Sequence, residues 1–187
     1  MRAVPDEPAS GSARLFLALC PGPQVQTALS SHAQAWHWNA DAACYAPLDW
    51  HVTLHFLGAV PRSRLDELRA ALAVPMRPFE LRFGEPALWP HGLAVLLPMA
   101  VPAALQALHD ELGRRLRQLG LKTDERAYRP HLTLARRAEQ ARPPAQWPAW
   151  GWRVHGYVLM ESTGQPEARY QVLQRYGQED TDTALQP

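Results

Sequence analysis

Two short stretches of this chain carry the same residue types at the same spacing. Residues 51–58 read HVTLHFLG and residues 131–136 read HLTLAR, so a His-x-Thr-Leu tetrapeptide occurs twice. Both stretches are rich in aliphatic and β-branched residues, which favours β-strands. Because residues i and i+2 of a strand point to the same face, each strand presents one imidazole and one hydroxyl to a common side. These groups belong to His51, Thr53, His131 and Thr133.

If the two strands line one cleft, this set of groups suits phosphoryl chemistry. The ordinary pKa of histidine is about 6.5, so one imidazole can be neutral and the other protonated near neutrality. The neutral ring can take a proton from water, and the protonated ring can give one to a departing alkoxide. Threonine hydroxyls can donate hydrogen bonds to non-bridging phosphate oxygens. A lone histidine on a strand is more often structural, but the repeat favours catalysis by His51 and His131, with Thr53 and Thr133 holding phosphate.

Metal binding is the main alternative use of these histidines. His51 and His55 are four residues apart, a spacing that would form a ligand pair on a helix. On a strand the two rings are about 13 Å apart, too far to share one ion. Proton transfer and hydrogen bonds can carry the developing charge without a metal. We therefore expect no metal and no other cofactor. The other histidines follow no shared pattern and are expected at the surface or in the core, at positions 32, 37, 91, 109 and 155.

Strands and helices alternate along the chain and must position the two motifs. Period-two patterns predict strands at 13–19, 51–57, 79–84, 93–97, 131–136, 151–162 and 168–176. Helical spacing predicts helices at 21–36, 61–73 and 101–120. The resulting order βα–βα–ββ–α–βββ gives each half of the chain sheet, helix and one His-x-Thr-Leu strand. This suggests two similar lobes that face each other within one domain.

The composition indicates a single globular domain. The chain has 187 residues, of which 47% are apolar, and a net charge of +1, so overall charge does not indicate nucleic-acid binding. No apolar run approaches the roughly 20 residues of a membrane helix. The two cysteines form no Cys-x-x-Cys pair, which favours the cytoplasm. We expect one bilobal domain at 14–177 between flexible tails at 1–13 and 178–187.

The paired HVTL and HLTL strands resemble the 2H phosphoesterase superfamily. Their longer contexts, LDWHVTLHFLG and YRPHLTLAR, are similar to its branch of RNA 2′,3′-cyclic phosphodiesterases, once called 2′-5′ RNA ligases. Weaker support comes from RLFLAL near the start and from YVLMES and ARYQVL near the end. The resemblance covers residues 14–176, nearly all of the expected domain.

The resemblance implies an α+β fold in which two antiparallel sheets face a central cleft, with helices outside and a pseudo-twofold axis. It also implies metal-independent hydrolysis of a terminal ribose 2′,3′-cyclic phosphate to a 2′-phosphate. By motif position, His51 would protonate the departing 3′ oxygen, His131 would activate water, and Thr53 and Thr133 would hold the phosphate. Some members of the family also catalyse the reverse joining to a 2′-5′ linkage.

Other residues near the motifs are candidates for substrate binding. Phe56 and Arg136 could sandwich a base, although strict alternation turns both away from the histidine face, so this requires strand twist or a β-bulge; otherwise Phe56 is core. Tyr128 either hydrogen-bonds substrate or packs. Arg14 and Phe16 occupy a strand where the family lines its cleft. Four arginines around the second motif either steer an RNA end or form a solvated loop, namely Arg126, Arg129, Arg136 and Arg137.

The expected partners are RNA ends or small nucleotides that bear a 2′,3′-cyclic phosphate. We expect a monomer with no obligatory protein partner. Two alternatives stay open: a 2H relative that acts on another cyclic or 2′-linked nucleotide, and a non-catalytic nucleotide- or RNA-binding module of the same fold. Pure binding does not require two titratable groups, so the two intact His-x-Thr pairs argue against the module.

Overall fold

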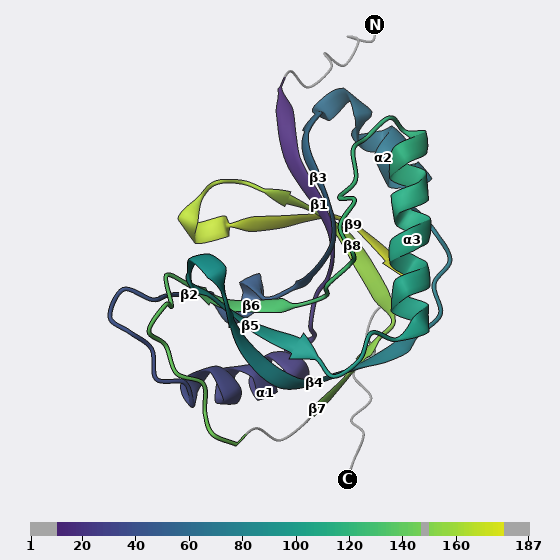
Figure 1. The fold of residues 1–187 in the computed structure, drawn as a ribbon. Helices are drawn as coiled ribbons and strands as arrows, with labels where there is room; N and C mark the ends of the chain where they lie inside the picture. Colours follow the sequence, from purple (N-terminus) through teal and green to yellow (C-terminus); the bar gives the residue numbers. More distant parts are fainter. Residues whose placement is uncertain (1–10, 147–149, 178–187) are drawn as a thin grey trace, which may run out of the picture.

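The structure, a computed structural model, describes residues 11–146 and 150–177 (Figure 1). The expected tails therefore lie outside the described residues, except for residues 11–13. Ser12 and Ala13 already belong to the first strand, and the Ala13 side chain is buried. The strands are β1 Ser12–Leu19, β2 Ala43–Cys44, β3 Val52–Pro61, β4 Phe79–Trp89, β5 Leu93–Pro98, β6 Leu132–Arg136, β7 Trp150–Val154, β8 Gly156–Ser162 and β9 Tyr170–Gly177.

Three α-helices and four short 3₁₀ turns connect these strands in the described part of the chain. The helices are α1 Pro23–Gln34, α2 Leu65–Ala71 and α3 Ala103–Gln118, and the turns are η1 Pro47–Asp49, η2 Arg62–Arg64, η3 Pro90–Gly92 and η4 Pro166–Ala168. Each helix is shorter than the sequence pattern suggested. The first residues expected in α2 form the turn η2 instead. Within the described ranges, no helix is both long enough and apolar enough to span a membrane.

The described strands form one antiparallel sheet rather than the two sheets expected. Its order is β7-β4-β5-β6-β3-β1-β8-β9, with β2 paired to β6. The two halves meet only between β3 and β6, through the single pair Val52 and Leu132. Joining the motif strands in this way gives backbone partners to edges that two separate sheets would leave unpaired. The α+β class and the division into two halves are as expected.

The segment 151–162 is two strands instead of one. The strand is interrupted at His155. Before this residue β7 pairs with β4 in one half of the sheet, and after it β8 pairs with β1 in the other half. Strands that are far apart in the sheet order are therefore adjacent along the chain. This connection requires the sheet to curl around the core, because one intervening residue cannot span a flat sheet.

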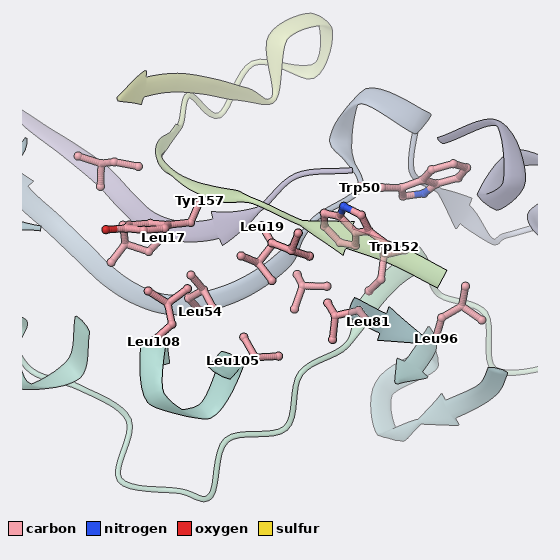
Figure 2. Packing of buried hydrophobic residues seen from close by; sticks show 14 of the residues in the cluster. Leu17, Leu19, Trp50, Leu54, Leu81, Leu96, Leu105, Leu108, Trp152 and Tyr157 are labelled. Carbon is pink, nitrogen blue, oxygen red and sulfur yellow. The ribbon is translucent and has the colours of Figure 1, made fainter. Parts of the chain in front are cut away.

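The larger of two apolar clusters in the described residues fills the curled sheet and the contact with α3. Leu105 and Leu108 of α3 lie near Leu54 of β3 (Figure 2). Leu81 of β4 and Trp152 of β7 join the same cluster on the other side of Leu19. This packing holds both halves of the sheet against one core and so fixes β3 relative to β6.

Candidate active site

The four motif side chains line one cavity of about 750 Å³. His51 and Thr53 come from the start of β3, and His131 and Thr133 from the start of β6. Antiparallel register around the pair Val52 and Leu132 sets His51 beside Thr133 and Thr53 beside His131. The motifs are thus related by an approximate twofold axis through this pair. From it, β3 and β6 run in opposite directions.

Both histidines are tethered in the same way. The Nδ1 atom of His51 lies 2.7 Å from the carbonyl oxygen of Asp49, and that of His131 lies 2.9 Å from the carbonyl oxygen of Arg129. A carbonyl oxygen can only accept, so each Nδ1 carries the hydrogen. Each Nε2 is therefore left for chemistry: it accepts a proton when the ring is neutral and donates one when the ring is protonated.

Aromatic neighbours hold each ring in place. The ring centroid of His51 is 5.0 Å from that of Phe16 and 5.0 Å from that of Tyr170. The ring of His131 lies 4.4 Å from that of Trp89, and the Arg129 guanidinium carbon is 4.9 Å from the centroid of Trp89. Packing on these faces restricts the rings to a narrow range of orientations.

Burial lowers the pKa of both histidines below the ordinary value. For His51 the hydrogen bond to Asp49 and the Asp49 carboxylate act in the opposite direction, while charge on His131 and Arg136 adds to the lowering. For His131 the hydrogen bond to the Arg129 carbonyl raises the pKa and the Arg129 charge lowers it. The charge on His131 lowers the pKa of His51, so the two rings interact within one site.

Two β-bulges bring Phe56 and Arg136 to the cavity. Opposite β1, Leu17 pairs with His55 but Ala18 pairs with Thr53, so Leu54 is an extra residue. Opposite β5, Ala94 pairs with Ala135 but Val95 pairs with Thr133, so Leu134 is the corresponding extra residue. Each bulge shifts the alternation of side chains between the two faces by one residue for the part of the strand that follows it. The residue five positions after each histidine therefore lies on the histidine face.

The cavity wall includes both of these residues. Phe56 is 72% exposed, so it is not a core residue, and its ring lies 6.1 Å from that of Phe16. Arg136 is exposed, and its guanidinium carbon lies 5.7 Å from the ring centroid of Tyr45. Phe56 adjoins Phe16, which contacts the His51 ring, and the Arg136 charge also acts on His51, so both residues flank the same histidine.

The remaining candidates divide into two groups. Arg14 and Phe16 of β1 line the cavity. Tyr128 and Arg129 are not among its lining residues: the Tyr128 hydroxyl donates to the carbonyl of Thr53 at 3.1 Å, and its ring stacks on His109. Tyr128 is therefore the packing residue that the sequence left as one possibility. Arg126 is paired with Asp124 and, like Arg137, is exposed outside the cavity wall.

Several lining residues were not anticipated. Tyr45 and Asp49 precede the first motif, and Arg169 and Tyr170 come from the β8–β9 hairpin. The Arg169 guanidinium carbon is 4.7 Å from the ring centroid of Tyr45, and its Nε is 3.6 Å from the Asp49 carboxylate. The hairpin, yellow-green in Figure 1, extends toward β2, and its residues form part of the cavity wall. The signals were adjacency to the motif for Asp49 and the stretch ARYQVL for the hairpin residues.

No three His, Cys, Asp or Glu side chains of residues 11–146 and 150–177 are grouped as metal ligands. His55 lies on the core side of β3, where its Nε2 donates to the carbonyl of His109 at 2.8 Å. It is therefore on the opposite face of the strand from His51.

Comparisons with known proteins agree with this geometry. The family model described as the 2′-5′ RNA ligase superfamily matches residues 23–166. An RNA 2′,3′-cyclic phosphodiesterase of Bacillus subtilis (strain 168) is 31% identical over 97 residues, which cover 49% of this chain and 53% of the relative. One of Geobacillus stearothermophilus is 34% identical over 107 residues, covering 51% of this chain and 32% of the relative. The matched regions thus span about half and about a third of these relatives.

The fold is also that of a solved structure. The crystal structure of E. coli LigT in its apo form has a TM-score of 0.76 with 23% sequence identity, and the match covers 90% of this chain and all of that one (100%). At this identity the likeness concerns the fold alone.

Proposed function

This chain belongs to the 2′-5′ RNA ligase superfamily, and from its site we propose that it hydrolyses the terminal ribose 2′,3′-cyclic phosphate of RNA to a 2′-phosphate. The observation that carries the proposal is the pair of matched histidines, each with Nδ1 tied to a carbonyl and with its Nε2 left for the cavity. The names of the Bacillus and Geobacillus relatives support the same activity.

In the proposed reaction, Nε2 of His131 takes a proton from a water molecule. The water oxygen forms a bond to phosphorus, and the bond between phosphorus and the 3′ oxygen breaks. Nε2 of protonated His51 delivers its proton to that departing oxygen, which leaves a 3′ hydroxyl and a 2′-phosphate. The hydroxyls of Thr53 and Thr133 donate to the non-bridging oxygens and follow their growing negative charge. Proton exchange with solvent restores both histidines.

The ends of the cavity suit a nucleotide next to the phosphate. Phe56 offers an exposed face on which a base can stack. Arg136 and Arg14 add guanidinium groups that attract the anionic chain. We propose RNA ends as the substrate on these grounds. A 5′ hydroxyl in place of water would give the reverse joining to a 2′-5′ linkage with the same two histidines.

The proposed setting is a monomer in the cytoplasm. Cys20 and Cys44 are both free thiols, which is compatible with a reducing compartment. Neither oligomerisation nor a protein partner is required, because both histidines come from one chain.

The test is incubation of an oligoribonucleotide bearing a 2′,3′-cyclic phosphate with the protein in EDTA. We expect the ring to open to a phosphomonoester that a non-specific phosphatase removes and that an enzyme removing only 3′-phosphates leaves in place, which identifies the 2′-phosphate. The double variant His51→Ala/His131→Ala is the matched control. Tight binding without turnover would indicate a binding module instead. A strict requirement for metal would contradict the mechanism, and turnover of only another cyclic nucleotide would change the substrate.

A further inference from the structure

The two histidines share a backbone arrangement but differ in the residue that provides it. In each motif the carbonyl two residues before the histidine accepts the hydrogen of Nδ1. On the His51 side that residue is Asp49, and on the His131 side it is Arg129. Equivalent positions of the approximate twofold axis therefore carry opposite charges. Nothing in the shared backbone geometry requires this difference, since any residue supplies a carbonyl.

The Asp49 carboxylate lies in the wall of the cavity, beside the ring that its own carbonyl holds. It is the only carboxylate among the described cavity-lining residues. Its one ion pair in the described chain, to Nε of Arg169, is 3.6 Å long. That contact is looser than a typical short pair of about 2.8 Å, and with Arg169 in place the Asp49 charge still raises the pKa of His51.

The charged and titratable groups around His51 lie on several elements, and the cavity wall also carries the cations Arg14 of β1 and Arg169 before β9. His131 and Arg136 on β6 oppose a proton on His51, whereas Asp49 on η1 favours one. Tyr170 on β9 touches the ring with an edge, and its phenol pKa is raised to about 12, so it stays neutral. Asp49 is therefore the group on this side that stabilises protonated His51.

Around His131 the field has the opposite sign. The Arg129 guanidinium lies over Trp89, whose ring also contacts that of His131. Trp89 is uncharged, and His51 is the other titratable group nearby, itself a cation when protonated. No carboxylate among the described residues counters this charge within the cavity. A proton on His131 is thus disfavoured by Arg129.

We propose that the residue two positions before each histidine assigns its role: Asp49 makes His51 the proton donor, and Arg129 makes His131 the proton acceptor. Both are positioning residues, because they act through the histidines rather than on the substrate. The inference rests on the proposed phosphodiesterase reaction. It explains how a nearly symmetric pair of motifs performs two different steps.

The test uses the full chain with Asp49→Asn and Arg129→Gln, which remove the charge and keep the carbonyl. Loss of the Asp49 carboxylate should lower the pKa of His51, so the alkaline limb of the kcat/KM profile moves to lower pH. Loss of the Arg129 guanidinium should raise the pKa of His131, so the acidic limb moves to higher pH. We expect each shift to be about half a pH unit or more. The two changes narrow the bell-shaped profile from opposite sides.

Nuclear magnetic resonance titration of the two imidazole C–H signals follows the protons directly. We expect His51 to titrate above His131 in the unchanged protein, and the gap to shrink in each variant. Asp49→Glu and Arg129→Lys retain the charge and should restore the limbs. Asp66→Asn and Arg82→Gln, exposed and outside the cavity wall, are charge-matched controls that should move neither limb.

The proposal and the proposed function fail in different ways. If the unchanged protein does not hydrolyse the cyclic phosphate, the function is wrong. If it does, but neither limb moves in Asp49→Asn or Arg129→Gln, these residues do not assign the roles. A broadened profile, or His131 titrating above His51, overturns the assignment as well. Equal narrowing in the two control variants would mean that net charge, and not position, is responsible.

Discussion

The strands β3 and β6 have one backbone plan and carry different side chains. Each directly follows a histidine tied through Nδ1 to the carbonyl two residues earlier, has a threonine as its second residue, and bulges at the next leucine. Beyond the bulge the strands differ: β3 continues with His55 and Phe56, and β6 with Ala135 and Arg136. The shared part brings two imidazoles and two hydroxyls to one cavity. The different part adds an aromatic ring from β3 and a guanidinium from β6 to the cavity wall.

The bulge explains how one short strand serves both the cavity and the core. Without it, alternation would turn Phe56 toward α3 and His55 toward the substrate. With it, His55 is buried and Phe56 is exposed in the cavity wall. The same shift in β6 buries Ala135 and exposes Arg136. The effect of mutating a residue in β3 can thus be compared directly with the effect of mutating the residue that the twofold axis relates to it in β6.

The largest expected effect is loss of either histidine. His51→Ala and His131→Ala should each lower turnover by about 10²–10⁴-fold, because each removes one of two proton transfers. Circular dichroism and thermal unfolding should show an intact fold, since neither ring belongs to the core. Initial rates on the cyclic-phosphate oligonucleotide measure the loss. A variant with nearly normal turnover would break the equivalence of the two strands and remove that histidine from the mechanism.

The threonines should give the next largest effect, and nearly the same one in both strands. Thr53→Val and Thr133→Val keep the shape and remove one hydroxyl donor to charged phosphate oxygens. A charge-assisted hydrogen bond of this kind contributes about 1.5–3 kcal/mol, so kcat/KM should fall roughly 10- to 100-fold in each. Thr→Ser variants should retain most activity. Effects that differ by more than tenfold between the strands would show that phosphate is held from one side only.

Phe56 and Arg136 should separate stacking from charge. Phe56→Ala should raise KM roughly fivefold, about 1 kcal/mol, because the exposed ring offers one face to a base. Arg136→Ala should raise KM at low salt and have less effect at high salt, because its contribution is electrostatic. Phe56→Tyr should be nearly neutral. If the salt dependence changes in Phe56→Ala rather than in Arg136→Ala, the assignment of stacking to Phe56 and of charge to Arg136 is wrong.

Much of this arrangement follows from local sequence. The motif strands and the sequence positions of the three helices could be predicted, because apolar periodicity and Gly or Pro punctuation are local signals. The single pair between Val52 and Leu132 could not, because a one-residue contact leaves no pattern. The break at His155 was hidden because the residue types on both sides of it favour a strand.

The candidate site was predictable where chemistry lies inside the motif and incomplete elsewhere. Leu54 and Leu134 are compatible with a regular strand, so nothing in their residue types indicates a bulge. The orientation of Phe56 was open for that reason. Tyr170 reaches His51 from more than a hundred residues away along the chain, through a hairpin. Contacts of that kind depend on the completed fold rather than on neighbouring residues.

The residue after each bulge should have the smallest effect on turnover. Its expected effect is on stability instead. On β3 this residue is His55, which stacks on His109 at 4.1 Å and has a pKa lowered to about 4, mainly by burial. On β6 it is Ala135, which does not titrate. In the unfolded chain His55 should take up a proton below about pH 6.5, while the folded chain resists it until about pH 4. Stability should therefore fall as the pH decreases through this interval.

His55→Gln retains an amide donor for the carbonyl of His109 and cannot titrate. We expect its free energy of unfolding, from urea titrations at pH 4.5 to 7.5, to depend less on pH than that of the unchanged protein. Some dependence should persist, because burial also lowers the pKa of His109. His37→Gln, at an exposed position, is the matched control, and both variants should keep nearly normal turnover at pH 7. An unchanged pH dependence in His55→Gln would mean that His55 is not held neutral in the core. The bulge at Leu54 would then not separate a core residue from a cavity residue, and β3 and β6 would differ in backbone as well as in side chains.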